Sequence, residues 1–133
     1  MNNDVYRIMK DMTFSEPAEE TAIKKAEQNL GVSLPEQYKE FLRKTNGAEG
    51  PIGETNYLAL WALELVEEIN KGSDTRSFLP GLLLFGSDGG DETYAFDSNR
   101  DFVILDVPFA AFDIEETEVV AETFEEFINR QNI

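Results

Sequence analysis

Two residue types are missing from this 133-residue chain, namely cysteine and histidine. Without cysteine the protein forms no disulfide and performs no thiol chemistry, which is compatible with a reducing compartment. Without histidine it lacks the usual general base, the Ser-His and Cys-His catalytic arrangements, and a preferred ligand of zinc. These absences exclude triad-type catalysis and argue against a zinc site.

Positive charge is scarce, because 11 Lys and Arg residues face 27 Asp and Glu residues and leave a formal net charge of −16. Such a chain should repel nucleic acid and anionic membranes, since both are bound mainly through Lys and Arg. It favours a basic protein partner, because opposite charges accelerate encounter. Acidity also promotes solubility by itself. Charge alone leaves these last two interpretations open.

Long hydrophobic runs are lacking as well. No apolar run approaches the length that spans a membrane, and the longest is interrupted at Gly86. The first residues, Met-Asn-Asn-Asp, do not have the basic and apolar regions of a secretion signal. A hydrophobic fraction of 41% is nevertheless typical of a globular protein with a core. We therefore expect a soluble, cytoplasmic protein with a single domain over residues 1–133.

The first half of the chain has the apolar spacing of amphipathic helices. Asp4 and Ser15 are placed to cap the first two helices, and Gly31 is placed to end the second. A third helix should open at Pro35 and end near Gly47. The sequence therefore predicts three helices before the first strand.

Finer expectations follow from the same spacing. Glu40 and Lys44 are four residues apart on the outer face of the third helix and should form an ion pair. A fourth helix should turn Leu65 inward and end at Gly72. The polar residues 73–77 that follow it predict a mobile loop.

Residues 82–97 give the clearest signal for β-structure. An apolar run at Leu82–Phe85 is followed by a turn rich in glycine and carboxylates, and then by a second run at Thr93–Phe96. This order is typical of a β-hairpin. The run at 102–107 has the continuous apolar character of a strand buried on both faces, and 117–120 can form one more strand.

The fold class follows from the order of these elements. Thr123 and Glu126 have the spacing of a capping box, which opens a closing helix. Neighbouring strands with short connections favour an antiparallel sheet, with a mixed sheet as the other possibility. We predict an α+β fold, a single compact domain with helices packed against the sheet.

The hairpin holds the tightest group of carboxylates: Asp88, Asp91, Glu92 and Asp97. Such oxygen ligands suit calcium or magnesium, but their spacing does not match an EF-hand loop. Paired carboxylates could also serve a hydrolase, yet this chain offers few cations to stabilise charge on a substrate. Asp and Gly also supply turn geometry without any ligand. We therefore predict no catalytic residue, no metal ligand and no cofactor.

An exposed aromatic within the acidic second half suggests a protein interface instead. Phe112 lies in a stretch whose charged residues are all acidic as far as Glu118. A phenylalanine ringed by carboxylates would suit contact with a basic partner. The candidate protein-binding residues are Asp88, Asp91, Glu92, Phe112, Asp113, Glu115 and Glu116.

Four motifs, found in order, resemble the SUKH superfamily, whose fungal branch contains the cell-wall assembly regulators. The first is Leu34–Gly47, with the sequence LPEQYKEFLRKTNG, and the second is Leu60–Leu65. The third is the hairpin Phe85–Asp97, and the fourth is Ala121–Ile128. The resemblance covers the chain from about residue 18 to residue 128.

The resemblance implies a compact α+β domain without catalytic activity. Bacterial domains of this kind are similar to immunity proteins, which bind and neutralise a cognate toxin, often a nuclease. A nuclease has a basic cleft because it holds phosphate, so an acidic inhibitor can occupy that cleft as a charge mimic. The resemblance brings no catalytic residues and no fixed interface positions to this chain.

Three functions therefore remain as hypotheses. The first is a toxin-binding immunity protein with a basic partner. The second is a regulatory or scaffold domain like the fungal proteins, and the third is a metal-dependent hydrolase that uses the hairpin carboxylates. The sequence leaves the oligomeric state and the identity of the toxin open.

Overall fold

The computed structural model describes residues 1–133, apart from the side chains of Ser73 and Asp74. Over these residues seven strands form one antiparallel sheet, in which the spatial order equals the order in the sequence. The strands are β1 (Thr13–Phe14), β2 (Ala48–Ile52), β3 (Asn56–Leu60), β4 (Leu82–Ser87), β5 (Glu92–Asp97), β6 (Val103–Pro108) and β7 (Glu118–Ala121). The helices are α1 (Asn3–Ile8), α2 (Glu20–Leu30), α3 (Glu36–Lys44), α4 (Leu63–Lys71), α5 (Ser73–Phe78) and α6 (Phe124–Gln131), with a 3₁₀ turn, η1, at Ile114–Glu116. The predicted α+β class is confirmed, and the sheet is antiparallel rather than mixed.

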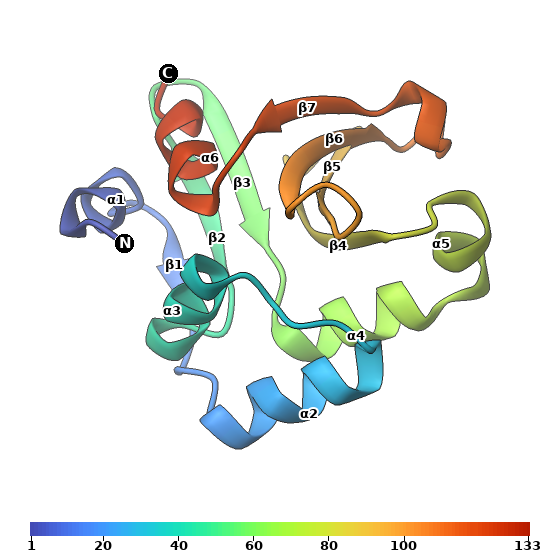
Figure 1. The fold of residues 1–133 in the computed structure, drawn as a ribbon. Helices are drawn as coiled ribbons and strands as arrows, with labels where there is room; N and C mark the ends of the chain where they lie inside the picture. The colour runs from blue at the N-terminus through green and yellow to red at the C-terminus, as the bar shows by residue number, and fades with distance from the viewer.

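The helices cover the sheet unequally. α1, α3 and α6 gather on one side of the molecule, where α6 contacts both α1 and α3 (Figure 1). α2 and α4 contact each other across one end of the sheet, and α4 also contacts β4 (Figure 1). None of the helices in the described chain is both long and apolar enough to cross a membrane.

An aromatic cluster joins the sheet to α3 and α6. Phe85 of β4 and Phe96 of β5 stack with their ring centroids 4.3 Å apart. Tyr38 of α3 lies 5.1 Å from Phe96, centroid to centroid, and 5.5 Å from Phe124 of α6. Phe127 of α6 meets Phe85 edge-on at 5.5 Å. These rings are almost completely buried, so they form the centre of the main core.

The central strands are buried on both faces. Because side chains alternate along a strand, Leu83 and Phe85 face the helices, whereas Leu82 and Leu84 enter a second apolar cluster on the opposite face. Leu105 and Val107 of β6 belong to this second cluster, while Ile104 belongs to the main core. The predicted hairpin at 82–97 and the predicted two-sided burial of 102–107 are both confirmed.

Gly86 lets two of these strands approach each other. A Cβ atom at this position would lie 2.6 Å from the carbonyl oxygen of Ala59 in β3, which is too close for any side chain. The register of the hairpin also shifts between Leu84 and Gly86, as in a β-bulge. The interruption of the apolar run is therefore required by the packing of β3 against β4.

Several helix ends agree with the sequence. Gly31 ends α2 with φ of 69°, and the N–H groups of Gly31 and Val32 both donate to the carbonyl of Glu27. Thr123 caps α6, because its hydroxyl accepts a hydrogen bond of 3.1 Å from the N–H of Glu126. Polar caps and glycine stops act through neighbouring residues, which is why these features could be predicted.

Two predicted caps are wrong. Asn2 rather than Asp4 caps α1, since its side chain accepts from the N–H of Asp4. α2 begins at Glu20 rather than near Ser15. The N–H of Ser15 instead donates to the hydroxyl of Thr45 at 2.8 Å, at the end of α3. This long-range contact holds the segment extended, and local sequence gives no sign of it.

The fourth helix is rotated relative to the prediction. α4 buries Leu63, Val66 and Asn70, whereas Leu65 is 40% exposed. The side-chain amide of Asn70 pairs with both the N–H and the carbonyl of Leu84, each at 2.8 Å. This buried polar contact determines the orientation of the helix. Residues 73–77 form most of α5, and the predicted loop is therefore wrong.

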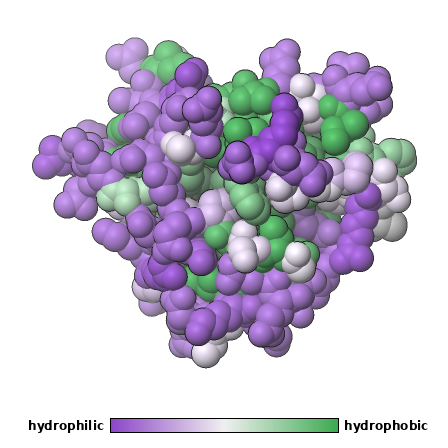
Figure 2. Space-filling model, viewed as in Figure 1, coloured by the Kyte–Doolittle hydropathy of each residue, from purple (hydrophilic) through white to green (hydrophobic). Residues whose placement is uncertain are grey.

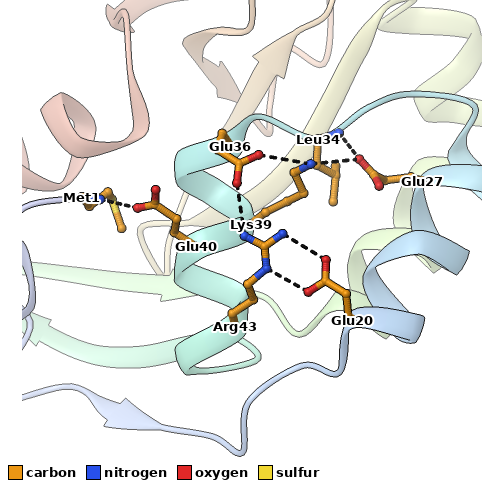
Figure 3. A network of polar contacts seen from close by, with 8 residues as sticks. All are labelled: Met1, Glu20, Glu27, Leu34, Glu36, Lys39, Glu40 and Arg43. Atoms are coloured by element: carbon orange, nitrogen blue, oxygen red, sulfur yellow. Dashed lines mark hydrogen bonds and ion pairs between the residues drawn. The ribbon is translucent and has the colours of Figure 1, made fainter.

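Ion pairs on α3 differ from the expected Glu40–Lys44 pair. Arg43 forms a two-point contact with Glu20 of α2, at 2.9 and 3.0 Å, and a further bond of 3.2 Å with Glu36 (Figure 3). Lys39 pairs with Glu36 and with Glu27 of α2 (Figure 3). This network clamps α2 to α3.

The two residues of the expected pair have other partners. Glu40 contacts the amino group of Met1 (Figure 3). The ammonium group of Lys44 lies 4.3 Å from the centre of the Tyr6 ring. Tertiary neighbours have replaced the expected pair within the helix.

Replacing Tyr38 with phenylalanine should stabilise the protein. The Tyr38 hydroxyl is buried, and no group of the described chain bonds to it; burial raises the pKa of Tyr38. Tyr38→Phe keeps the ring and removes the desolvated hydroxyl, so the free energy of unfolding should rise by ~1 kcal/mol. Urea unfolding monitored by circular dichroism measures this change. Phe124→Ala provides the contrast with an expected loss of ~3–5 kcal/mol, and a loss in Tyr38→Phe would contradict the assignment.

Candidate protein-binding surface

The carboxylates at the two ends of β5 have structural partners. Asp88 accepts hydrogen bonds from the N–H groups of Gly90 at 2.8 Å and Glu92 at 3.2 Å, which holds the hairpin turn closed. Asp97 is buried, accepts from the N–H of Asn99 at 2.9 Å and pairs with Arg100 at 2.7 Å. Both side chains are thus used to shape turns, as Asp commonly is.

Glu92 lies on the face of the sheet that the helices cover. It stands two residues before Tyr94, and Asp106 of β6 lies directly opposite Tyr94, so the three side chains share one face. Burial, followed by the adjoining Glu92 carboxyl, raises the pKa of Asp106 to about 7. Burial and the nearby Asp88 raise the pKa of Tyr94 to about 12. Asp106 therefore keeps its proton to a higher pH than an exposed carboxyl would.

The structure does not gather the hairpin carboxylates into a cation site. Asp88 and Asp97 lie at opposite ends of β5, and Glu92 is directed to the face of Asp106. Among the side chains that the structure describes, no three carboxylates are placed to hold one metal ion. The geometry gives no support to the metal-dependent hydrolase hypothesis.

Asp91 has a different position, because its backbone connects the hairpin to the acidic loop after β6. The N–H of Phe109 donates to the carbonyl oxygen of Asp91 at 2.8 Å. Asp113 then caps η1, accepting from the N–H of Glu115 at 3.0 Å. Asp91 therefore lies beside the loop that carries Phe112, Asp113, Glu115 and Glu116. The backbone bond places Asp91 next to the start of this loop, whereas the side chain of Asp88 closes the hairpin turn and that of Glu92 is directed to the face of Asp106.

Three phenylalanines form a shallow pocket at this loop, called here the aromatic pocket: Phe78, Phe109 and Phe112. The cavity measures about 440 Å³ and Thr75 completes its lining. Phe78 is 56% exposed and Phe109 58% exposed, which is unusual for such large apolar side chains. Phe112 is partly buried against the second apolar cluster, and its ring centroid lies 6.4 Å from that of Phe109.

Sequence reasoning identified Phe112 and missed the other two walls. Phe78 follows a polar stretch that resembles a loop, and Phe109 directly follows the proline that ends β6. Phe109 and Phe112 stand at the two ends of a turn rather than on a helix, so helical spacing does not relate them. Phe78 carries no sequence signal either, because it meets the other two rings only in the tertiary structure.

Two walls of the pocket belong to an acidic segment of the chain. All charged residues from Asp101 to Glu126 are acidic. Among the ion pairs of the described residues, only Glu126 of this segment has a cationic partner, Arg130, while Lys39, Arg43 and Arg100 contact carboxylates outside it. Figure 2 shows a largely hydrophilic face with smaller apolar areas between its polar side chains. An apolar pocket beside unpaired carboxylates suits a cationic partner.

The fold is that of a small α+β domain with one sequentially ordered antiparallel sheet. The family model described as SMI1 / KNR4 family (SUKH-1) matches residues 17–130. The chain belongs to this family, and its resemblance to the SUKH superfamily is confirmed.

One relative, described only as "Uncharacterized protein YnaB" from Bacillus subtilis (strain 168), is 37% identical to this chain over 94 residues. The matched region covers 69% of this chain and 60% of that protein. The chain therefore spans less than two thirds of the length of this relative. Because this relative is named without a function, the similarity assigns no function to this chain.

The Glu92–Asp106 pair should make stability fall as pH rises. The raised pKa of Asp106, about 7 in the folded state against 3.8 unfolded, favours the protonated folded form. The stabilisation of the folded state by protonated Asp106 is fully present below about pH 4 and is lost as pH rises through about 7. Asp106→Asn cannot ionise, so at pH 8 it should be more stable than the wild type by ~1 kcal/mol, after allowance for solvent screening.

Urea unfolding at pH 5 and pH 8 measures the effect, and the advantage of Asp106→Asn should shrink at the lower pH. Asp113→Asn provides a control with an exposed carboxyl that caps η1. An advantage of Asp106→Asn that is equal at both pH values would contradict the raised pKa of Asp106.

Proposed function

We propose that this protein is a non-catalytic immunity protein, which binds and neutralises a cognate, basic bacterial toxin in the cytoplasm. The observation that carries the proposal is the exposed acidic loop that supplies two walls of the aromatic pocket, on a chain that belongs to the SUKH-1 family. Such a surface provides an apolar anchor together with a field that attracts basic proteins.

The charge distribution supports inhibition by occupation of a basic cleft. A toxin that acts on nucleic acid must hold phosphate with Lys and Arg. A protein with net charge −16 can compete for those side chains by presenting carboxylates in place of phosphates. Binding alone protects the cell in this mechanism, and it requires no catalytic group from the inhibitor.

The alternative is a regulatory or scaffold domain that recruits cellular proteins. The resemblance to the SUKH superfamily supports keeping this alternative, because the fungal branch of that superfamily contains the cell-wall assembly regulators. An acidic surface with an aromatic anchor would suit that role as well. The two functions differ in their consequences, since only an immunity protein protects a cell from a toxin.

Co-expression with toxin domains encoded beside the gene in its host should restore growth to cells that those domains otherwise arrest. The purified toxin domain and this protein should form a one-to-one complex, because one acidic surface meets one basic cleft. Added salt should weaken the complex mainly through a slower association rate, as screening shortens the reach of the charges. Growth curves and stopped-flow association kinetics measure these outcomes.

Paired substitutions locate the charge that matters. Glu115→Gln with Glu116→Gln removes two exposed carboxylates from η1, which follows Phe112 in the same loop, and should slow association with the toxin. The charge-matched control is Glu16→Gln with Glu19→Gln, which removes two exposed carboxylates just before α2 and should leave protection intact. Failure of the wild type to protect against any neighbouring toxin domain, together with capture of several unrelated host proteins, would favour the regulatory alternative.

A further inference from the structure

We propose that the aromatic pocket receives an arginine side chain of the basic partner. This inference rests on the proposed function and deepens it, because it names the chemical group that the surface recognises. The pocket comprises Phe78, Phe109 and Phe112, and the loop that carries Phe109 and Phe112 continues into three exposed carboxylates, Asp113, Glu115 and Glu116.

The walls of the pocket favour a side chain with an apolar stem. Phe78 comes from α5, while Phe109 and Phe112 come from the loop after β6, so the rings form separate sides of one depression. Phe109 and Phe112 lie nearly parallel, at 25°. Aromatic faces attract cations and accept the methylene groups of long charged side chains. A carboxylate would gain neither the attraction of a cation to the rings nor the packing of a long methylene stem in this pocket.

The acidic loop favours a cation over a neutral apolar residue. Asp113, Glu115 and Glu116 follow Phe112 directly in the chain and are exposed on η1 and its cap, and the exposed Asp91 lies next to Phe109 through a backbone hydrogen bond. A neutral apolar side chain would fill the pocket. It would supply no positive charge to compensate the carboxylates that the partner then approaches. A guanidinium can stack on a ring and donate to a carboxylate at the same time. Arginine therefore meets both parts of the site, and lysine meets them less well.

The cation on α5 of this chain does not line the pocket. Arg76 lies two residues before Phe78 and lines an adjoining groove with Pro80, Ser98 and Phe102, which shares Thr75 with the aromatic pocket. Among the side chains that the structure describes, the aromatic pocket is lined by Thr75 and the three phenylalanines. The site thus presents its rings and carboxylates outward, to a group from another molecule.

Titration of the full chain with short peptides tests the inference by nuclear magnetic resonance. The probes are acetyl-Gly-Arg-Gly-amide, the same peptide with lysine, and the same peptide with citrulline, which has nearly the shape of arginine but no charge. The arginine peptide should shift the ring signals of Phe78, Phe109 and Phe112. The lysine peptide should bind more weakly than the arginine peptide. The citrulline peptide should bind about fivefold more weakly than the arginine peptide, or not at all.

Variants of the exposed walls locate the effect. Phe78→Ala and Phe109→Ala should each weaken binding of the arginine peptide by about fivefold. Phe112 is left unchanged because it also supports the second apolar cluster. Phe14→Ala is the matched control, since Phe14 is 44% exposed on β1 at the opposite edge of the sheet. Thermal unfolding of each variant establishes that it is folded.

Equal binding of the arginine and citrulline peptides would overturn the inference, because the pocket would then recognise apolar shape alone. Shifts that spread over the acidic surface and persist in Phe78→Ala and Phe109→Ala would overturn it as well, since they would reflect general charge attraction. Absence of any binding of the arginine peptide would also overturn the inference.

The toxin assay separates this inference from the proposed function. If the wild type protects and the two Phe variants protect equally well, the pocket is not the anchor but the immunity function stands. If the arginine peptide binds in the pocket and no toxin domain is neutralised, the recognition chemistry stands and the immunity function fails. Loss of both peptide binding and protection in Phe78→Ala and Phe109→Ala, with Phe14→Ala unaffected, supports both.

Discussion

The stacking of Phe85 on Phe96 is the contact on which the rest of the fold depends. It lies on the helix-covered face of the β4–β5 hairpin, and α3 and α6 reach it through Tyr38, Phe124 and Phe127. Aromatic pairs of this kind contribute ~0.5–1.5 kcal/mol each beyond the burial of their area. Segments far apart in the sequence are therefore brought together at one point. The remaining strands extend the sheet outward from that centre in sequence order.

Charge is distributed unevenly around this core. Lys39 and Arg43 neutralise carboxylates between α2 and α3, where they clamp two helices together. The loop between β6 and β7 receives no such compensation, because its charged residues are all acidic. Lys39 and Arg43 thus stabilise the contact between α2 and α3, whereas the loop between β6 and β7 contributes only negative charge to its surroundings. A surface of this kind suits recognition of a cation more than chemistry.

The hairpin carboxylates illustrate how similar residues acquire different roles. Asp88 and Asp97 are absorbed by turns, and Glu92 is directed to the helix-covered face, where it meets Asp106. Only Asp91 joins the loop of Phe112, and it does so through its backbone. Proximity in sequence suggested a single site, but alternation along β5 sends neighbouring side chains to opposite faces. The functional surface therefore consists of residues from α5, the hairpin turn and the loop after β6.

The sequence alone determined the features that depend on neighbouring residues. Its apolar periodicity, the glycine stop at Gly31, the capping box at Thr123 and the hairpin at 82–97 all follow from local conformational preference. Its composition determined the acidity and the lack of histidine and cysteine. Only the tertiary structure decided that Leu65 faces outward, that residues 73–77 are helical, and that Phe78 lies beside Phe109 and Phe112. These outcomes depend on contacts across the chain, such as Asn70 with Leu84, whose energies exceed the weak local preferences of the residues involved.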